Sequence, residues 1–282
     1  MAGNAIGYLL PRPLDKGESL MFAPFMMNAW ICGSLAAIVC GMVGFFVVLR
    51  GESFLAHAVP NGAFAGAALA ALTGGNTLLT MGIFALIGSL GSTAIRRRAR
   101  SDTATALTLV ILLASGSLFL SLSGKYALQV YSLMFGQILG VGTQQIIPML
   151  IIGILCILAV IIVRKPLLEA SIMPQQRTVL GVSPAWYDVI FAIVLAGAAT
   201  MSVPQIGALL SFSLLTGPAA GACRLVRHPW KAMVLSAGLA LLDIWASLAL
   251  GYLTDWPIGF FCTAFSLLIY LFATFVTRRG SR

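Results

Sequence analysis

The stretch MNAWICGSLAAIVCGMVGFFVVLR, residues 27–50, decides the fold of this chain. It runs without a charged side chain from Met27 to Leu49 and then ends at Arg50. About 20 mostly apolar residues are enough for a helix to cross a lipid bilayer, and residues 27–49 meet that length. The run therefore predicts a membrane-spanning helix with a basic residue at its end.

The same pattern recurs to the end of the chain and predicts an all-α, polytopic membrane protein. Composition agrees, because 60% of the residues are hydrophobic, 9% are charged and the mean hydropathy is +1.00, where soluble domains carry roughly 25% charged residues. We expect about nine spans, with eight also possible, in a single domain covering residues 1–282. The predicted spans are 27–49, 53–72, 78–95, 103–122, 146–163, 186–201, 206–223, 233–252 and 258–276.

Basic residues follow every odd-numbered span, and the opposite loops carry very few charges. Basic loops remain in the cytoplasm, so the charges place the N-terminal segment, residues 1–25, outside and the C-terminus in the cytoplasm. If one apolar run is re-entrant, the N-terminal side reverses while the basic loops stay inside. The basic residues are Arg50; Arg96, Arg97, Arg98 and Arg100; Arg164 and Lys165; Arg177; Arg224, Arg227 and Lys231; and Arg278, Arg279 and Arg282.

This distribution also explains the net charge of +9 without nucleic acid as a partner, because the positive charges lie in short loops. No secretory signal peptide is evident, since residues 1–20 lack an apolar core followed by a small-residue cleavage site. Residues 123–145 are too polar and glycine-rich to span, so we expect a short interfacial or re-entrant helix there, on the outer side. The five cysteines form no CxxC pair and are predicted to be small apolar residues rather than disulfides or metal ligands: Cys32, Cys40, Cys156, Cys223 and Cys262.

Two ionisable residues within predicted spans are candidates for a cation pathway, because such groups are costly in a membrane. His57 lies early in the second span, and a neutral imidazole is a common ligand of transition metals. Pro60, three residues later, cannot donate a backbone hydrogen bond and distorts the helix. Asp243 lies near the middle of the eighth span. The alternatives are a structural histidine bonded to a backbone carbonyl and a structural carboxylate bonded to a serine or a backbone N–H.

Other polar residues suggest more local roles. Glu52, beside Arg50, is predicted to form an ion pair or interface anchor more readily than a substrate site. Asp188 and Asp255 are predicted to be turn or cap residues. His228, in a basic loop, is expected to contact a partner or lipid headgroups. The chain has no GxxxxGK[ST], HExxH or GxSxG motif, so we expect no enzyme here, and any nucleotide that drives transport must bind another chain.

Five segments in register resemble the membrane-spanning permease subunits of zinc, manganese and iron-type ABC importers. Residues 53–62 (SFLAHAVPNG) match a D-A-x-S-H-A-V-x-P-G-like segment, and residues 131–141 (YSLMFGQILGV) match Y-L-F-G-x-I-L-G-V. Leu180 and Gly181 end a cytoplasmic segment as in the family. Residues 205–220 (QIGALLSFSLLTGPAA) match Q-x-V-G-x-L-L followed by P-A-A, and residues 255–259 (DWPIG) match D-x-P-x-G.

The second segment departs from the family pattern around the histidine. Ser53 stands where the family has an acidic residue, and Ala56 replaces the serine before the histidine. If that acid coordinates metal in the family, His57 needs another partner here. Glu52 and Asp243 are the candidates.

The resemblance implies a multi-pass permease of the cell (inner) membrane that imports a divalent transition metal, with zinc or manganese favoured, by alternating access around His57, Asp243 and Glu52. It implies a second copy of the chain, two ATPase subunits beneath, an extracytoplasmic metal-binding protein above, and no cofactor bound by the chain itself. Residues 217–231 would form the coupling element through Pro218, Ala219, Arg224 and Arg227, with a short helix formed by Pro218 and the small residues after it. Alternatives are a permease for an iron–siderophore or cobalamin-like chelate, a stand-alone channel or secondary transporter, and an intramembrane enzyme.

Overall fold

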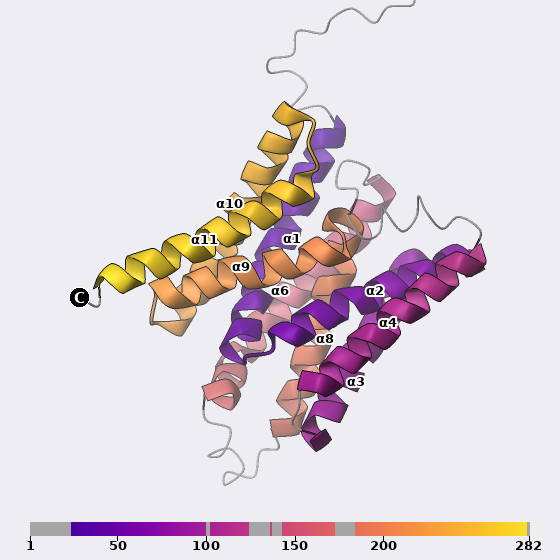
Figure 1. Ribbon diagram of the computed structural model, residues 1–282, viewed down its shortest axis with the longest axis horizontal. Helices are drawn as coiled ribbons and strands as arrows, with labels where there is room; N and C mark the ends of the chain where they lie inside the picture. The colour runs from indigo at the N-terminus through magenta and orange to yellow at the C-terminus, as the bar shows by residue number, and fades with distance from the viewer. Residues whose placement is uncertain (1–23, 100–101, 124–135, 137–142, 173–183, 281–282) are drawn as a thin grey trace, which may run out of the picture.

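The computed structural model describes residues 24–99, 102–123, 136, 143–172 and 184–280, and in these residues the chain is helical with no strand (Figure 1). The predicted all-α class is confirmed. Eight of the nine described helices are long and apolar enough to cross a membrane, and α9 is the ninth. The helices are α1 (Pro24–Leu49), α2 (Ser53–Thr73), α3 (Thr77–Ala99), α4 (Asp102–Ser123), α6 (Thr143–Ile172), α8 (Pro184–Ile206), α9 (Ala208–Leu225), α10 (Pro229–Thr254) and α11 (Ile258–Gly280).

Several helices extend beyond the predicted apolar runs. α6 continues past Arg164 to Ile172, and α10 begins at Pro229, ahead of the predicted start at residue 233. The reason is physical: hydropathy marks where a helix leaves the lipid, whereas the backbone hydrogen bonds continue while long basic side chains reach the interface. The short helix predicted within residues 123–145 lies almost wholly outside the described residues.

A single glycine separates α8 from α9. Gly207 has φ 91° and ψ 158°, a conformation that is essentially restricted to glycine. Its N–H still donates to the Val203 carbonyl, and its own carbonyl accepts from the Ser211 N–H. The chain therefore reverses without a long loop, and α8 and α9 are separate helices as the sequence predicts.

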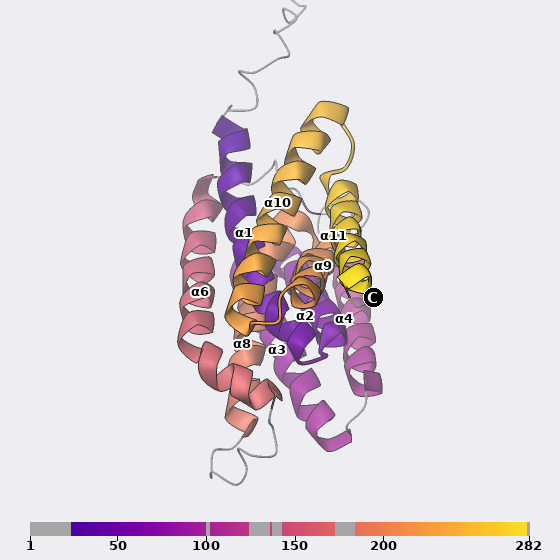
Figure 2. The ribbon, with the colours of Figure 1, turned by 90° about the vertical axis from the view of Figure 1, so that its left-hand side faces the viewer.

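Contacts along the helices fix their relative directions. α1 and α10 are antiparallel, since Ser236 Oγ donates to the Gly41 carbonyl at 2.6 Å and Trp245 Nε1 donates to Ser34 Oγ at 2.8 Å. α9 and α11 are parallel, because Leu210 packs near Gly259 and Thr277 Oγ1 donates to the Arg224 carbonyl. Figure 2 shows α1 between α6 and α10.

Small residues let the helices approach closely. A Cβ built on Gly44 of α1 would lie 1.8 Å from the Leu215 carbonyl oxygen of α9, and one on Gly66 of α2 would lie 2.3 Å from the Thr80 carbonyl oxygen of α3. Such contacts dominate helix association in lipid, where apolar burial itself provides little driving force.

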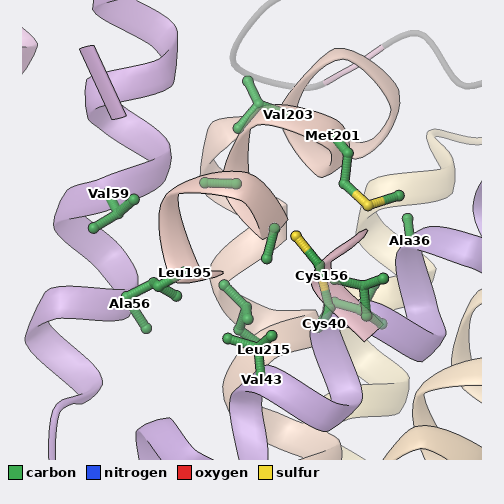
Figure 3. Close-up of a cluster of buried hydrophobic side chains, with 14 of the residues drawn as sticks. Ala36, Cys40, Val43, Ala56, Val59, Cys156, Leu195, Met201, Val203 and Leu215 are labelled. Atoms are coloured by element: carbon green, nitrogen blue, oxygen red, sulfur yellow. The ribbon is translucent and has the colours of Figure 1, made fainter. Parts of the chain in front are cut away.

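The buried core draws on all nine described helices, and α1, α2, α6, α8 and α9 meet in one part of it. Figure 3 shows side chains of all five helices meeting, with the thiols of Cys40 and Cys156 among them. Both cysteines are free, as are the buried Cys32 and Cys262 and the half-buried Cys223. The prediction of small buried side chains is confirmed for Cys32, Cys40, Cys156 and Cys262, whereas Cys223 lies half-buried near the end of α9.

Candidate metal pathway

A buried ion-pair cluster closes the junction between α1 and α2. Arg50 Nε donates to Glu52 Oε1 at 2.8 Å, and Arg50 Nη2 donates to Asp188 Oδ1 of α8. The Arg50 and Glu52 side chains are only 8% and 3% exposed, and the guanidinium lies over the Phe191 ring. Burial by itself would lower the pKa of Arg50, but the carboxylates of Glu52 and Asp188 raise it overall.

This cluster gives two of the predicted residues a defined place. Glu52 forms the ion pair expected from its neighbour Arg50. Asp188 lies inside α8, which begins at Pro184, and pairs with Arg50 rather than capping the helix. The partner across 138 residues of sequence could not be read from local pattern, since only the packing of α8 against α1 brings it there. Asp255 does occupy a turn, as the left-handed C-cap of α10 with φ 57°.

His57 lies in the second turn of α2 and faces α9. Its ring meets Phe212 edge-on, with centroids 5.0 Å apart. Within the part of the chain that the structure describes, Nδ1 is buried and has no hydrogen-bond partner. A buried polar atom without a partner costs free energy and is uncommon. Nδ1 of His57 is therefore a candidate position for a ligand.

Asn61 stands one helical turn beyond His57 and is 1% exposed. Its Nδ2 donates to the His57 carbonyl at 2.7 Å, whereas Oδ1 is buried and lacks a partner among the described residues. Pro60 has no N–H, so it leaves the Ala56 carbonyl without its usual helical donor. The result is a local group of polar acceptors on a helix that is otherwise apolar. An amide within an apolar run, next to the helix-distorting Pro60 and four residues from the histidine, was the sequence signal for Asn61.

Asp243 is satisfied by serines. Ser266 Oγ of α11 donates to Asp243 Oδ2 at 2.7 Å, and Ser247 Oγ lies 3.3 Å from Oδ1. Asp243 is 2% exposed, and Ser266 also reaches the Ser213 carbonyl of α9. These contacts match the structural alternative for Asp243, a carboxylate that holds α10 against α9 and α11.

The structure does not bring His57, Asp243 and Glu52 together. His57 contacts Phe212, Asp243 connects to Ser213 through Ser266, and Glu52 is held by Arg50. Among the described residues no group of three or more histidine, cysteine, aspartate or glutamate side chains could hold a metal ion. This conformation thus presents separate polar positions rather than one assembled centre.

The predicted coupling residues fall in two environments. Pro218 and Ala219 are buried within α9, which continues to Leu225, so residues 217–225 do not form the separate short helix that was expected. Pro218 is tolerated because close packing of α9 against α11 supports the distorted turn. Arg224 and Arg227 are exposed where α9 ends. Arg224 Nη2 donates to the Tyr270 hydroxyl at 2.9 Å.

The fold and these sites define a multi-pass α-helical permease. The profile of the ABC 3 transport family matches residues 22–277, and the chain belongs to that family. It lies in the cell membrane as a transport subunit.

Similar proteins span nearly the same length. The manganese import system permease protein ScaB of Streptococcus parasanguinis is 28% identical over 89% of this chain and 90% of its own length. The manganese transport system membrane protein MntC of Listeria monocytogenes is 24% identical, over 93% and 95% of the two chains. The solved structure of PsaBC from Streptococcus pneumoniae in complex with Fab superposes with a TM-score of 0.81, covering 90% of this chain and 92% of the other at 24% identity.

Proposed function

We propose that this chain is the permease subunit of an ATP-driven importer for a divalent transition metal ion, with manganese favoured over zinc. The observation that carries the proposal is the similarity to manganese permeases across about nine-tenths of both chains. ATP would be hydrolysed on a separate ATPase chain. The chain itself would bind no resident cofactor, and the metal would be its cargo.

His57 and Asn61 are the proposed polar positions on the pathway. Their unpartnered Nδ1 and Oδ1 atoms lie one turn apart on α2, and nitrogen and oxygen donors of these types suit manganese and zinc alike. Asp243 and Glu52 remain candidate co-ligands. To bind metal, Asp243 would have to leave its serines and Glu52 would have to leave Arg50. Both changes would accompany the helix movements that open the pathway to one face of the membrane and then to the other.

α9 is the proposed link between the pathway and the ATPase. It carries Phe212 against His57 and Arg224 at its exposed end, which are about 18 Å apart at about 1.5 Å per residue. α9 is continuous over this length, with Pro218 inside it, so a displacement at Arg224 and Arg227 would reach Phe212 through the helix. Pro218 and Ala219 would act inside this helix rather than at the ATPase surface. We propose the assembly as two copies of this chain, two ATPase subunits and an extracytoplasmic metal-binding protein.

Uptake of radiolabelled manganese and zinc tests the proposal in cells that lack their own importers and express this chain with its ATPase and binding protein. We expect manganese uptake that is lost when the ATPase partner is inactivated. His57→Ala should reduce uptake at least tenfold, and His57→Gln, which keeps a polar acceptor, should retain part of it. Gln145→Ala, at an exposed position near the start of α6, serves as the control and should transport normally.

Undiminished manganese uptake by His57→Ala at normal protein level would exclude the histidine from the pathway. A second candidate is a chelate permease, favoured by one observation: in this conformation the acidic residues near the pathway are engaged with Arg50 or with serines. Uptake of an iron–siderophore complex without uptake of free manganese would select that alternative. Uptake that continues without an active ATPase would select a secondary transporter.

A further inference from the structure

A pocket of about 210 Å³ lies at the basic end of the bundle, between α1, α6 and α10. We call it the α1–α6–α10 pocket. α6 and α10 flank α1, as Figure 2 shows, and the side chains of Phe45 and Phe46 supply α1's part of the wall. Its lining residues are Phe45, Phe46, Arg164, Lys165, Leu168, His228, Pro229, Trp230 and Met233.

The polar part of this lining is basic. Arg164 and Lys165 come from α6, and His228 precedes α10; none of the lining residues is acidic. Glu169, one turn beyond Lys165 along α6, lies outside the lining. The pocket therefore favours an anion.

An aromatic side chain and a helix end complete the site. The Arg164 guanidinium lies 4.2 Å from the centroid of the Trp230 ring, which holds the cation in place. α10 begins at Pro229, and its N-cap residue His228 makes no side-chain capping bond. Pro229 has no N–H, and the Ala232 N–H donates to the His228 carbonyl, so the Trp230 and Lys231 N–H groups are the first-turn donors left at the positive end of the helix dipole, where phosphate groups bind readily.

The depth of the pocket matches the headgroup layer of a membrane. Arg164 lies about 28 Å along α6 from Gln145, at about 1.5 Å per residue, and the hydrocarbon core is about 30 Å thick. Exposed apolar side chains flank the pocket toward the membrane centre, with Ile161 and Ile162 on α6 and Val234 on α10. A ligand here would meet cations at one end and apolar helix surfaces at the other.

We propose that the α1–α6–α10 pocket binds the phosphate headgroup of an anionic phospholipid, with the acyl chains lying along α6 and α10. Basic pockets between membrane helices bind such headgroups, and each basic side chain near the surface strengthens binding measurably. The occupied site would tie α6 to α10 across α1. This role is independent of the transported cargo.

Lipid retention by the complete transporter, purified and placed in phosphatidylcholine nanodiscs with a minor fraction of phosphatidylglycerol, tests the proposal by native mass spectrometry. The double variant Arg164→Gln, Lys165→Gln should lose about tenfold in retained phosphatidylglycerol. Arg278→Gln with Arg279→Gln, which removes two charges from the end of α11, should lose less than twofold. Arg164→Lys, which keeps the charge, should retain most of the binding.

Other results would overturn the proposal. Equal losses in the two double variants would mean general attraction to a positive surface. Displacement of the lipid by millimolar glycerol phosphate would mean that a soluble phosphate occupies the pocket. Normal lipid retention with lost ATPase association would make it a protein contact. If the double variant does not fold, the unchanged protein decides: phosphatidylglycerol must raise its melting temperature more than phosphatidylcholine does.

Discussion

At the scale of single residues, the buried polar side chains differ in whether their atoms have hydrogen-bond or ion-pair partners. Pro60 has no N–H to donate to the Ala56 carbonyl, and His57 and Asn61 each keep a buried polar side-chain atom without a hydrogen bond among the described residues. Arg50 shows the opposite case, because its buried charge is matched by two carboxylates. In a low-dielectric environment, buried polar atoms without a hydrogen bond are candidate ligand positions, whereas buried ion pairs hold neighbouring helices together.

Removal of the Arg50 charge should destabilise the protein strongly. Arg50→Ala leaves the buried carboxylate of Glu52 and the partly buried one of Asp188 without their cation, and such a change costs about 3 kcal/mol or more. Thermal unfolding in detergent, followed by loss of the monodisperse species, measures the effect. Arg227→Ala, which removes an exposed arginine, is the control and should cost about 0–1 kcal/mol.

A compensating variant separates charge from packing at the same site. If unpaired carboxylates cause the loss, Arg50→Met combined with Glu52→Gln and Asp188→Asn should recover much of it. Equal instability of the single and triple variants would instead assign the effect to the contact of Arg50 with Phe191.

At the scale of elements, glycine positions set how closely the helices pass. α1 crosses α9 at Gly44 and meets α10 at Gly41, where a Cβ would lie 2.6 Å from the Ala237 Cα atom. α2 meets α3 at Gly66 in the same way. These approaches are against backbone atoms, which cannot move aside as a flexible side chain can, so the spacing of the helices depends on glycine at these positions.

Two glycines in similar helices should respond oppositely to alanine. Gly44→Ala places a methyl group against the Leu215 carbonyl, so we expect a loss of about 1–3 kcal/mol or a failure to assemble. Gly91→Ala in α3 has no atom within 4 Å of the new Cβ and should be neutral or stabilise by about 0.5–1 kcal/mol through helix propensity. Detergent thermostability compares the pair, and equal effects would contradict the packing argument.

At the scale of the whole molecule, the alternation of helix directions collects the basic residues at one end. The Arg50 cluster joins the end of α1 to the start of α8, and Arg164 on α6 meets Trp230 at the start of α10. The loop residue Asp255 lies at the opposite end of α10. By the positive-inside rule we expect the basic end to face the cytoplasm.

Cysteine accessibility in intact cells tests this orientation. With the native cysteines as background, four of them buried and Cys223 half-buried, a membrane-impermeant maleimide should label Asp255→Cys from outside and should leave Arg227→Cys unlabelled until the cells are opened. The reverse pattern would place the basic end outside. Labelling of both without opening the cells would show that the membrane was not intact, which a cytoplasmic marker protein controls.

The sequence by itself determined the class, the approximate spans and the family resemblance. Three signals can be recognised without knowing any tertiary contact, because they are local or periodic. They are the apolar runs of membrane length, the basic residues after alternate runs and the motif around His57. Boundaries were less accurate at Arg164 and Pro229, because hydropathy reports the lipid boundary and not the end of hydrogen bonding.

Only the tertiary structure decided which polar residues meet. Asp188 reaches Arg50 because α8 packs against α1, Asp243 is bound by Ser266 of α11, and Pro218 is buried where α9 packs on α11. The α1–α6–α10 pocket likewise unites residues more than 100 positions apart. Such pairings depend on how the nine described helices pack, and the energies that choose among packings are sums of many small contacts that no local pattern encodes.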